Sequence, residues 1–82
     1  MTNLEKYTEA FTKALEIRPE QTKGLEYQQI KEWDSVGHMT LMTAIEETFD
    51  IMLETEDIID FNSFEKGMEI LKDKYGVDFS DC

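Results

Sequence analysis

The segment 32–39 holds the side chains best suited to chemistry, among them Asp34, Ser35 and His38. A serine at the start of a helix presents its hydroxyl oxygen beside unpaired backbone amides and the positive end of the helix dipole. A phosphate ester on that oxygen would be stabilised there. Asp34 and Ser35 are also good N-cap residues, the simpler interpretation from the residues alone. The two roles are compatible, because capping by Asp34 leaves the Ser35 hydroxyl free.

The trio of Asp34, Ser35 and His38 does not predict a hydrolase. A catalytic triad needs an imidazole between the hydroxyl and the carboxylate, with oxyanion donors around a substrate pocket. Neighbours on one helical turn do not supply this arrangement, and the G-x-S-x-G pattern is absent. Two interpretations of His38 stay open. It is a surface or packing residue, or it makes a polar contact with a bound group or partner near neutral pH.

A first helix from Thr2 to about Leu15 and a long loop after it precede this segment. Apolar residues recur at helical spacing up to Leu15, and Thr2 with Glu5 has the form of a capping box. Pro19 interrupts the pattern, since the residue before a proline is pushed out of the helical region. The connection 17–33 is unusually long, so its apolar side chains are expected to pin it across the helices. They are Leu25, Tyr27, Ile30 and Trp33.

A second helix is predicted to begin at Asp34 or Ser35, followed by a short helix near 58–61 and a last helix from about 63 to 75. The second helix should turn apolar residues inward, namely Val36, Met39, Leu41, Met42, Ile45 and Phe49. Asn62 or Ser63 can cap the last helix, and Gly76 suits the left-handed residue beyond its end. Gly67 within that helix predicts close helix packing. The predicted fold is all-α: an antiparallel four-helix bundle of three longer helices and one short one, with a long loop between the first and second helices.

Acidic side chains are concentrated in the middle of the chain. The net charge is −11, and residues 34–60 hold eight acids and no lysine or arginine. This balance argues against binding to nucleic acid and disfavours anionic membranes, whereas it should attract basic partners. The simpler alternative is a solvated acidic face. The eight acids are Asp34, Glu46, Glu47, Asp50, Glu54, Glu56, Asp57 and Asp60.

The size of the chain limits what it can do alone. Its 82 residues predict one domain, 1–82, whose thin core leaves little surplus stability for an elaborate cleft, so an enzyme is not expected. No EF-hand pattern begins at Asp34 or Asp50, and no metal site is predicted. The lone Cys82 is expected to be an incidental exposed thiol. With no apparent signal peptide or membrane span, we expect a cytoplasmic monomer.

Asp34-Ser35 followed by an aliphatic residue, in a helix that ends with Glu46-Glu47-Thr48-Phe49, resembles the phosphopantetheine attachment region of acyl carrier proteins. The resemblance covers nearly the whole chain in the order and length of its elements. It implies a 4′-phosphopantetheine arm, transferred from coenzyme A to Ser35 by a phosphopantetheinyl transferase, with Asp34 as the acidic residue before the attached serine. Such a carrier holds acyl intermediates as thioesters and delivers them to partner enzymes.

The resemblance also implies a docking face and an acyl shelter. Basic patches of acyl-loading and acyl-using enzymes would dock on Glu46, Glu47, Asp50, Glu54, Glu56 and Asp57. The apolar interior is first of all core. If the bundle opens slightly, it is also expected to shelter cargo, with adaptable methionines helping. The candidates for this shelter are Met39, Met42, Ile45, Phe61 and Met68.

Three residues near Ser35 depart from the pattern of fatty-acid carriers. The positions of Gly37 and Thr40 are typically acidic there, and that of His38 is usually a small hydroxyl residue. The form Trp-Asp-Ser-aliphatic-Gly-His looks more like carriers of specialised pathways. The cargo stays open among fatty acyl, polyketide, amino acyl and other acids. The alternative function is a noncatalytic interaction module that keeps the carrier fold and is never modified.

Overall fold

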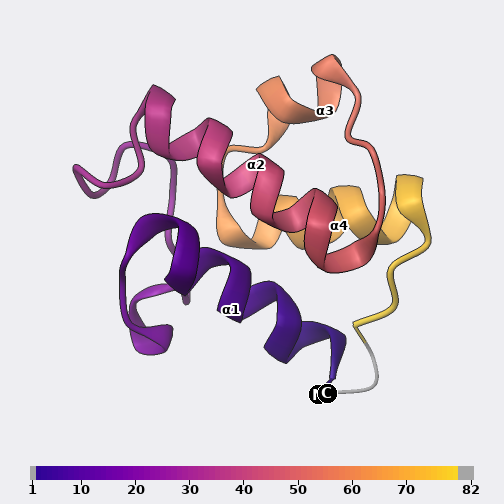
Figure 1. Cartoon of the computed structure of the whole chain (residues 1–82), viewed down its shortest axis with the longest axis horizontal. Helices are drawn as coiled ribbons and strands as arrows, with labels where there is room; N and C mark the ends of the chain where they lie inside the picture. Colours follow the sequence, from indigo (N-terminus) through magenta and orange to yellow (C-terminus); the bar gives the residue numbers. More distant parts are fainter. Residues whose placement is uncertain (1, 80–82) are drawn as a thin grey trace.

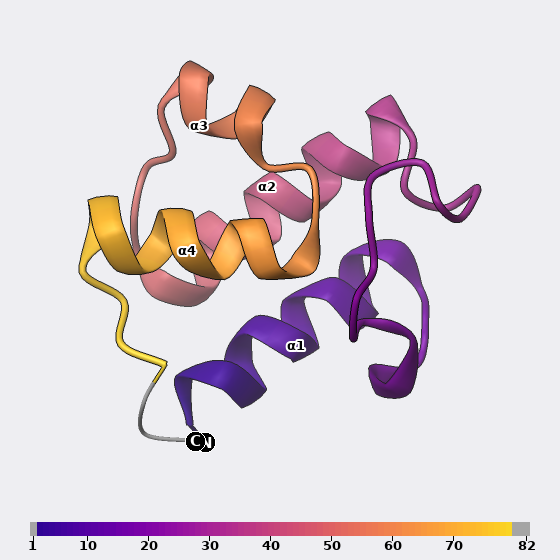
Figure 2. The same cartoon turned by 180° about the vertical axis from the view of Figure 1, so that it is seen from behind.

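The computed structural model describes residues 2–79, which form a small helical bundle (Figure 1). Its elements are α1 (Asn3–Leu15), the 3₁₀ turn η1 (Pro19–Gln21), α2 (Ser35–Phe49), α3 (Thr55–Asp60) and α4 (Phe64–Tyr75). Figures 1 and 2 show α1 running opposite to α2 and α4, with the short α3 beside them. The predicted all-α fold, with three longer helices, a short one and a long first loop, is confirmed. Cys82 lies outside the described residues.

Short polar side chains begin the longer helices, as predicted. Thr2 and Glu5 form the capping box of α1, and Ser63 accepts a hydrogen bond from the Lys66 backbone N–H at the start of α4. The end of α4 at Gly76, which adopts φ 70°, also agrees with the prediction. α1 ends at Leu15, as predicted, but the left-handed conformation of Glu16 that ends it, with φ 56°, was not foreseen.

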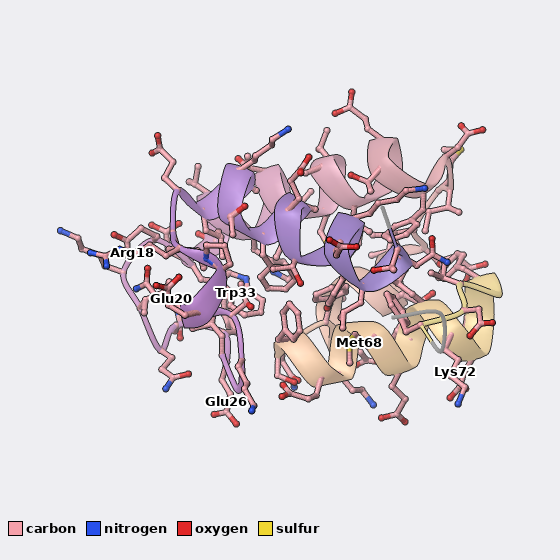
Figure 3. The ribbon with its side chains drawn as sticks, turned by 90° about the horizontal axis from the view of Figure 1, so that it is seen from below. Arg18, Glu20, Glu26, Trp33, Met68 and Lys72 are labelled. Carbon is pink, nitrogen blue, oxygen red and sulfur yellow. The ribbon has the colours of Figure 1, made fainter. Side chains whose placement is uncertain are left out.

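The long loop is pinned to the bundle by side chains and by its backbone. Leu25 and Trp33 are buried, which confirms the predicted anchoring. The Tyr27 N–H donates to the carbonyl of Asn62 at 2.8 Å, and the Phe64 N–H donates to the carbonyl of Leu25 at 2.8 Å. In Figure 3, Trp33 lies between the loop and the helices, whereas Arg18 and Glu26 of the loop point outward. This backbone pairing holds the loop against the start of α4.

An aromatic cluster forms the centre of the core. The ring of Tyr7 lies 5.0 Å from that of Phe11 and 4.7 Å from that of Phe64, and Phe11 lies 5.3 Å from Trp33, all between centroids. The Tyr7 hydroxyl donates to the Phe64 carbonyl at 2.7 Å. A methyl group on Gly67 would collide with the Tyr7 hydroxyl and with a buried ring, so the close packing predicted at Gly67 is confirmed.

Two residues predicted to face inward are exposed instead. Val36 is 74% exposed and Met39 is 54% exposed. The buried face of α2 follows Leu41, Met42 and Ile45, and at about 100° per residue Val36 and Met39 fall toward the opposite side. The prediction was wrong because the apolar stripe of α2 is wider than the face that packs. Met39 therefore lies outside the closed interior in which it was expected to shelter cargo.

Candidate functional site

Ser35 is the first residue of α2, and Asp34 is the N-cap of that helix. One carboxylate oxygen of Asp34 accepts a hydrogen bond from the Gly37 backbone N–H at 2.8 Å. Ser35 is exposed, and its hydroxyl forms no hydrogen bond with any of residues 2–79. Of the two caps that the sequence allowed, the structure uses Asp34. The Ser35 oxygen is thus accessible and is not needed for the helix itself.

Gly37 allows the end of the long loop to lie directly against the first turn of α2. A Cβ atom at this position would collide with the backbone carbonyl oxygen of Glu32 and would lie 3.3 Å from a methyl group of Leu15. The carbonyl belongs to the backbone, so it cannot move aside as a flexible side chain would. Sequence reasoning noted Gly37 only as a departure from a family pattern. Its structural role, which helps to fix the position of Ser35, was missed.

His38 connects three segments of the chain. The indole N–H of Trp33 donates to Nδ1 of His38 at 2.9 Å, so Nδ1 carries no proton, and the Nε2–H then donates to the Ile58 carbonyl at 2.7 Å. The imidazole also contacts the rings of Tyr27 and Phe61, with centroids 5.3 and 6.2 Å away. Both ring nitrogens are therefore engaged within the fold. Of the two interpretations left open, the structure shows a packing residue.

Asp57 is a structural residue, which corrects its assignment to the docking face. It is 1% exposed, accepts a hydrogen bond from the Lys74 ammonium at 2.6 Å, and accepts another from the Tyr75 hydroxyl at 2.5 Å. The bond from Lys74, followed by that from Tyr75, lowers the pKa of Asp57. The pKa of Lys74 is raised by the same carboxylate, and that of Tyr75 by burial and then by the bond to Asp57. These two hydrogen bonds join α3 to α4, so the Asp57 carboxylate faces α4 and not the surface.

The remaining acids predicted for docking divide into two groups. Glu46 is half-buried, and one of its carboxylate oxygens accepts a hydrogen bond from the Leu53 backbone N–H at 2.9 Å, so it also holds the connection to α3. The other four are exposed and together are called the acidic surface below: Glu47, Asp50, Glu54 and Glu56. Exposed apolar side chains occur on the same segments, namely Val36, Met39, Met52 and Ile59. The combination presents acids and apolar groups within one stretch of the chain.

A cavity of about 190 Å³ lies between the long loop, α2 and α3. Its lining consists of Tyr27, His38, Ile58, Ile59, Phe61 and Asn62. Ser35 and His38 are three residues apart on α2, so they are neighbours on the helix surface. Phe61 is the one predicted shelter residue in this lining. Met42 and Ile45 are at most 1% exposed, and Met68 is packed against the core.

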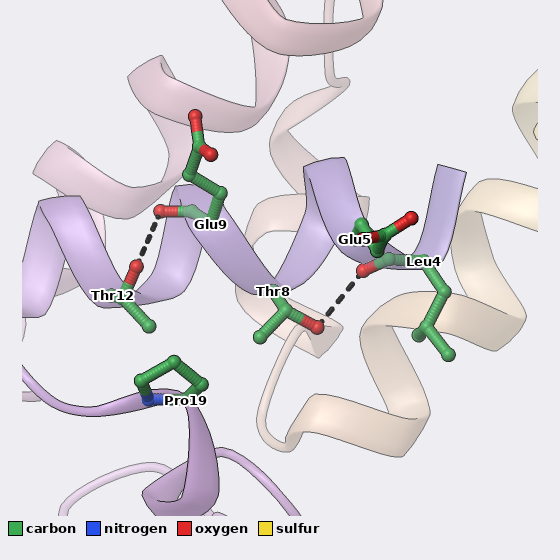
Figure 4. A pocket seen from close by; sticks show the side chains of 6 residues that line it. All are labelled: Leu4, Glu5, Thr8, Glu9, Thr12 and Pro19. Carbon is green, nitrogen blue, oxygen red and sulfur yellow. Dashed lines mark hydrogen bonds between the residues drawn. The ribbon is translucent and has the colours of Figure 1, made fainter. Parts of the chain in front are cut away.

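A second cavity, of about 390 Å³, lies between α1 and Pro19 (Figure 4). Its polar groups already have local partners, because the hydroxyls of Thr8 and Thr12 each donate to a backbone carbonyl of α1 at 2.9 Å. Glu5 belongs to the capping box, and the hydrogen bond from the Thr2 backbone chiefly lowers its pKa. The cavity offers few free groups to a ligand, and none of the predicted site residues lines it.

Comparisons with known protein families, with curated proteins and with solved structures found no match to this chain. None of the helices formed by residues 2–79 combines the length and the apolar character needed to cross a bilayer. In the same part of the chain, no three histidine, cysteine or acidic side chains are grouped so that they could hold a metal ion. The case for a function therefore depends on the geometry around Ser35 and on its sequence pattern.

Proposed function

We propose that the protein is an acyl carrier protein that holds acyl intermediates on a 4′-phosphopantetheine arm attached to Ser35. The observation that supports this most is the exposed and unbonded Ser35 hydroxyl at the first residue of α2, with Asp34 serving as the cap in its place. A modifying enzyme could reach this oxygen without opening the fold. The carrier itself performs no reaction in this proposal, and partner enzymes supply the chemistry.

The start of α2 suits the phosphodiester that joins the arm to the serine. The backbone N–H of Val36, in the first turn, has no carbonyl four residues earlier within the helix to bond. The positive end of the helix dipole also favours the negative charge of a phosphate group attached to the Ser35 oxygen. The arm supplies a thiol on which acyl groups are carried as thioesters. The protein would contribute a fixed attachment point, with Gly37 and the Asp34 cap holding the first turn in place.

The cavity lined by His38, one turn along α2 from Ser35, is suited to a tethered apolar group. Its walls include the apolar side chains of Ile58, Ile59 and Phe61, and Ile59 is 72% exposed. At about 190 Å³ it is smaller than the roughly 300–1,000 Å³ of typical small-molecule sites, so it suits a segment of a ligand rather than a whole one. A group held on an arm from Ser35 meets this description, because the covalent link keeps the group close to the cavity at a high effective concentration, so that weak contacts suffice to hold it.

The acidic surface is suited to enzymes with basic docking patches. Its four residues lie on α2, at the end of that helix and at the start of α3, in a segment without lysine or arginine. Long-range attraction would raise the encounter rate with basic partners and would weaken with salt. Two exposed side chains close to Ser35 provide apolar contact area for such a partner: Val36, which follows it directly, and Met39, four residues along α2.

The modification experiment tests the proposal directly. The purified protein is incubated with coenzyme A and several phosphopantetheinyl transferases, and its intact mass is measured. We expect the wild type to gain the mass of the arm and Ser35→Ala to gain nothing. Thr43→Ala is the matched control, because Thr43 offers another exposed hydroxyl on α2 and its loss should leave the gain unchanged. A wild type that stays unmodified with every transferase would refute the proposal and favour the interaction module.

The docking role is tested by the salt dependence of the same reaction. Replacing Glu47 with glutamine and Asp50 with asparagine should slow arm transfer by about tenfold at low salt and much less at high salt. The control carries the same two charge changes on α4, at Glu69 and Asp73, which are both exposed. Equal rates for the two double variants at low salt would remove the acidic surface from the proposal.

A further inference from the structure

We propose that His38 determines the cargo length of this carrier. Its imidazole closes the cavity that it lines, one turn of α2 from Ser35, toward the bundle interior, so that only a short acyl chain is sheltered. The inference rests on the proposed function, because the cargo reaches the cavity through an arm on Ser35. It goes further by naming the class of cargo and the residue that sets its limit. Three observations support it.

The first observation is the position of His38 on α2. It lines the cavity, and Met42 and Ile45 follow it four and seven residues later on the same face of the helix. A chain that entered from the cavity and continued along α2 into the interior would therefore meet the imidazole first. His38 lies between the outer cavity and the residues in which a deeper shelter would have to form.

The second observation is that the imidazole is held from both sides. Nδ1 accepts the hydrogen bond of the Trp33 indole at 2.9 Å, and Nε2 bonds the Ile58 carbonyl at 2.7 Å. The imidazole ring lies nearly parallel to the ring of Trp33, at 20° with centroids 6.1 Å apart, and Trp33 is fully buried. If His38 swung aside, it would leave a buried indole N–H without its acceptor, and such orphaned donors are rare in folded proteins. His38 thus behaves as a fixed wall.

The third observation is that the interior behind His38 is closed. Leu41 and Ile45 are fully buried, and Met42 is 1% exposed. Interiors of this kind are close-packed and hold little void. Cargo is therefore limited to the outer cavity of about 190 Å³. At roughly 30 Å³ for a group the size of a water molecule, this has room for about six atoms.

The test compares acyl chains of increasing length on the modified protein. The arm is loaded with straight chains from about two to ten carbons, and the rate of thioester cleavage by hydroxylamine is measured for each. In the wild type, protection should increase with each carbon up to about six and then stay constant. Each sheltered methylene slows cleavage by at most about fourfold, which corresponds to ~0.8 kcal/mol. In His38→Ala, the space vacated by the imidazole should extend the cavity toward the interior, so that protection continues to increase beyond six carbons before it levels off.

Two further variants separate a gate from a general structural role. His38→Gln keeps an acceptor for Trp33 and a donor for Ile58, so it should restore the limit near six carbons. Trp33→Phe keeps a buried ring but removes the N–H that holds the imidazole, so longer chains should gain protection even if His38→Ala does not fold. Thr43→Ala, on the exposed side of α2, should behave as the wild type.

The outcomes separate this inference from the proposed function. Protection that rises steadily to ten carbons in the wild type, or a plateau that is unchanged in folded His38→Ala and in Trp33→Phe, would overturn the role of His38 while leaving the arm in place. A wild type that never gains the mass of the arm would refute the proposed function, and the inference with it.

Discussion

Neutralising Asp57 should destabilise the protein far more than neutralising its exposed neighbour Glu56. The changes Asp57→Asn and Glu56→Gln each remove one negative charge from adjacent positions of α3 and preserve the approximate size of the side chain. Only Asp57 is buried and bonded to Lys74 and Tyr75. The comparison therefore isolates the connection between α3 and α4 from the general effect of charge.

The magnitude follows from the two bonds that Asp57 accepts. Hydrogen bonds to charged groups contribute about 1.5–3 kcal/mol, and the Tyr75 hydroxyl is one such donor. Asparagine would keep one oxygen that accepts a hydrogen bond from Lys74 or Tyr75, but its amide N–H groups would face the other donor, which then has no acceptor. Because Lys74 is half exposed, water can replace part of its bond. We expect Asp57→Asn to lower the free energy of unfolding by about 2 kcal/mol, and Glu56→Gln to change it by less than ~0.5 kcal/mol.

Urea unfolding followed by tryptophan fluorescence provides the measurement. Trp33 is the only tryptophan and is fully buried, so its emission reports the loss of the core. With a slope near 1 kcal/mol per molar urea for so small a domain, the midpoint should fall by ~2 M. The melting temperature should fall by roughly 8–16 °C. Equal midpoints for the two variants would refute the structural role of Asp57.

The pH dependence gives an independent check on the same connection. The pKa of Asp57 is lowered in the folded state from its ordinary value of 3.8, chiefly by the bond from Lys74. The contribution of Asp57 to the free energy of unfolding is therefore complete above its pKa in the unfolded state, and it is lost as the pH falls through its pKa in the folded state. The difference in the free energy of unfolding between the wild type and Asp57→Asn should stay constant from neutral pH to about pH 4 and become smaller below it. A difference that disappears already near pH 6 would contradict the assignment.

Three further predictions concern the core and the first turn of α2. Gly67→Ala places a methyl group against Tyr7 and Phe61, so the free energy of unfolding should fall by about 1–3 kcal/mol, measured by urea unfolding. In Gly37→Ala the added methyl group collides with the Glu32 carbonyl oxygen, so the substitution should destabilise the protein and slow arm transfer to Ser35. An unchanged rate of arm transfer would argue against a role of Gly37 in positioning the site. Burial raises the pKa of Tyr7 well above 10.0, so the stability due to its buried neutral hydroxyl is present below pH 10 and should be lost as the pH rises further. Of the absorbance of the three tyrosinates, the part from Tyr7 should appear together with the loss of Trp33 burial, as reported by fluorescence.

Local signals in the sequence predicted most of the fold and the setting of Ser35. Helix starts follow from short capping side chains, and the Asp34 cap that frees Ser35 is a relation between residues three apart. The left-handed conformation of Glu16 at the end of α1 could not be predicted in this way, because residues other than glycine seldom adopt it. Sequence periodicity also misplaced Val36, since an apolar side chain on a helix does not show which side another helix will cover.

The contacts that define the site are long-range, so the sequence alone could not reveal them. Asp57 reads as one more acid in an acidic segment until α4 brings Tyr75 against it, 18 residues along the chain. His38 likewise depends on Trp33 and on a carbonyl of α3. An aromatic residue just before Asp34 was the only local signal for the role of His38. Trp33 indicated a buried ring near the start of α2, but not that His38 would accept its hydrogen bond.

The backbone bridge between Glu26 and Ser63 has a consequence for how the site comes to exist during folding. It closes a ring of chain that contains α2 and α3, and joining ends so far apart costs roughly 3 kcal/mol of chain entropy. Its few hydrogen bonds cannot offset that cost until Leu25 and Phe64 enter the core on either side of them. We therefore expect the contacts around Ser35 that depend on the long loop to form only with the whole fold, and a peptide cut from around the serine should keep the Asp34 cap at most.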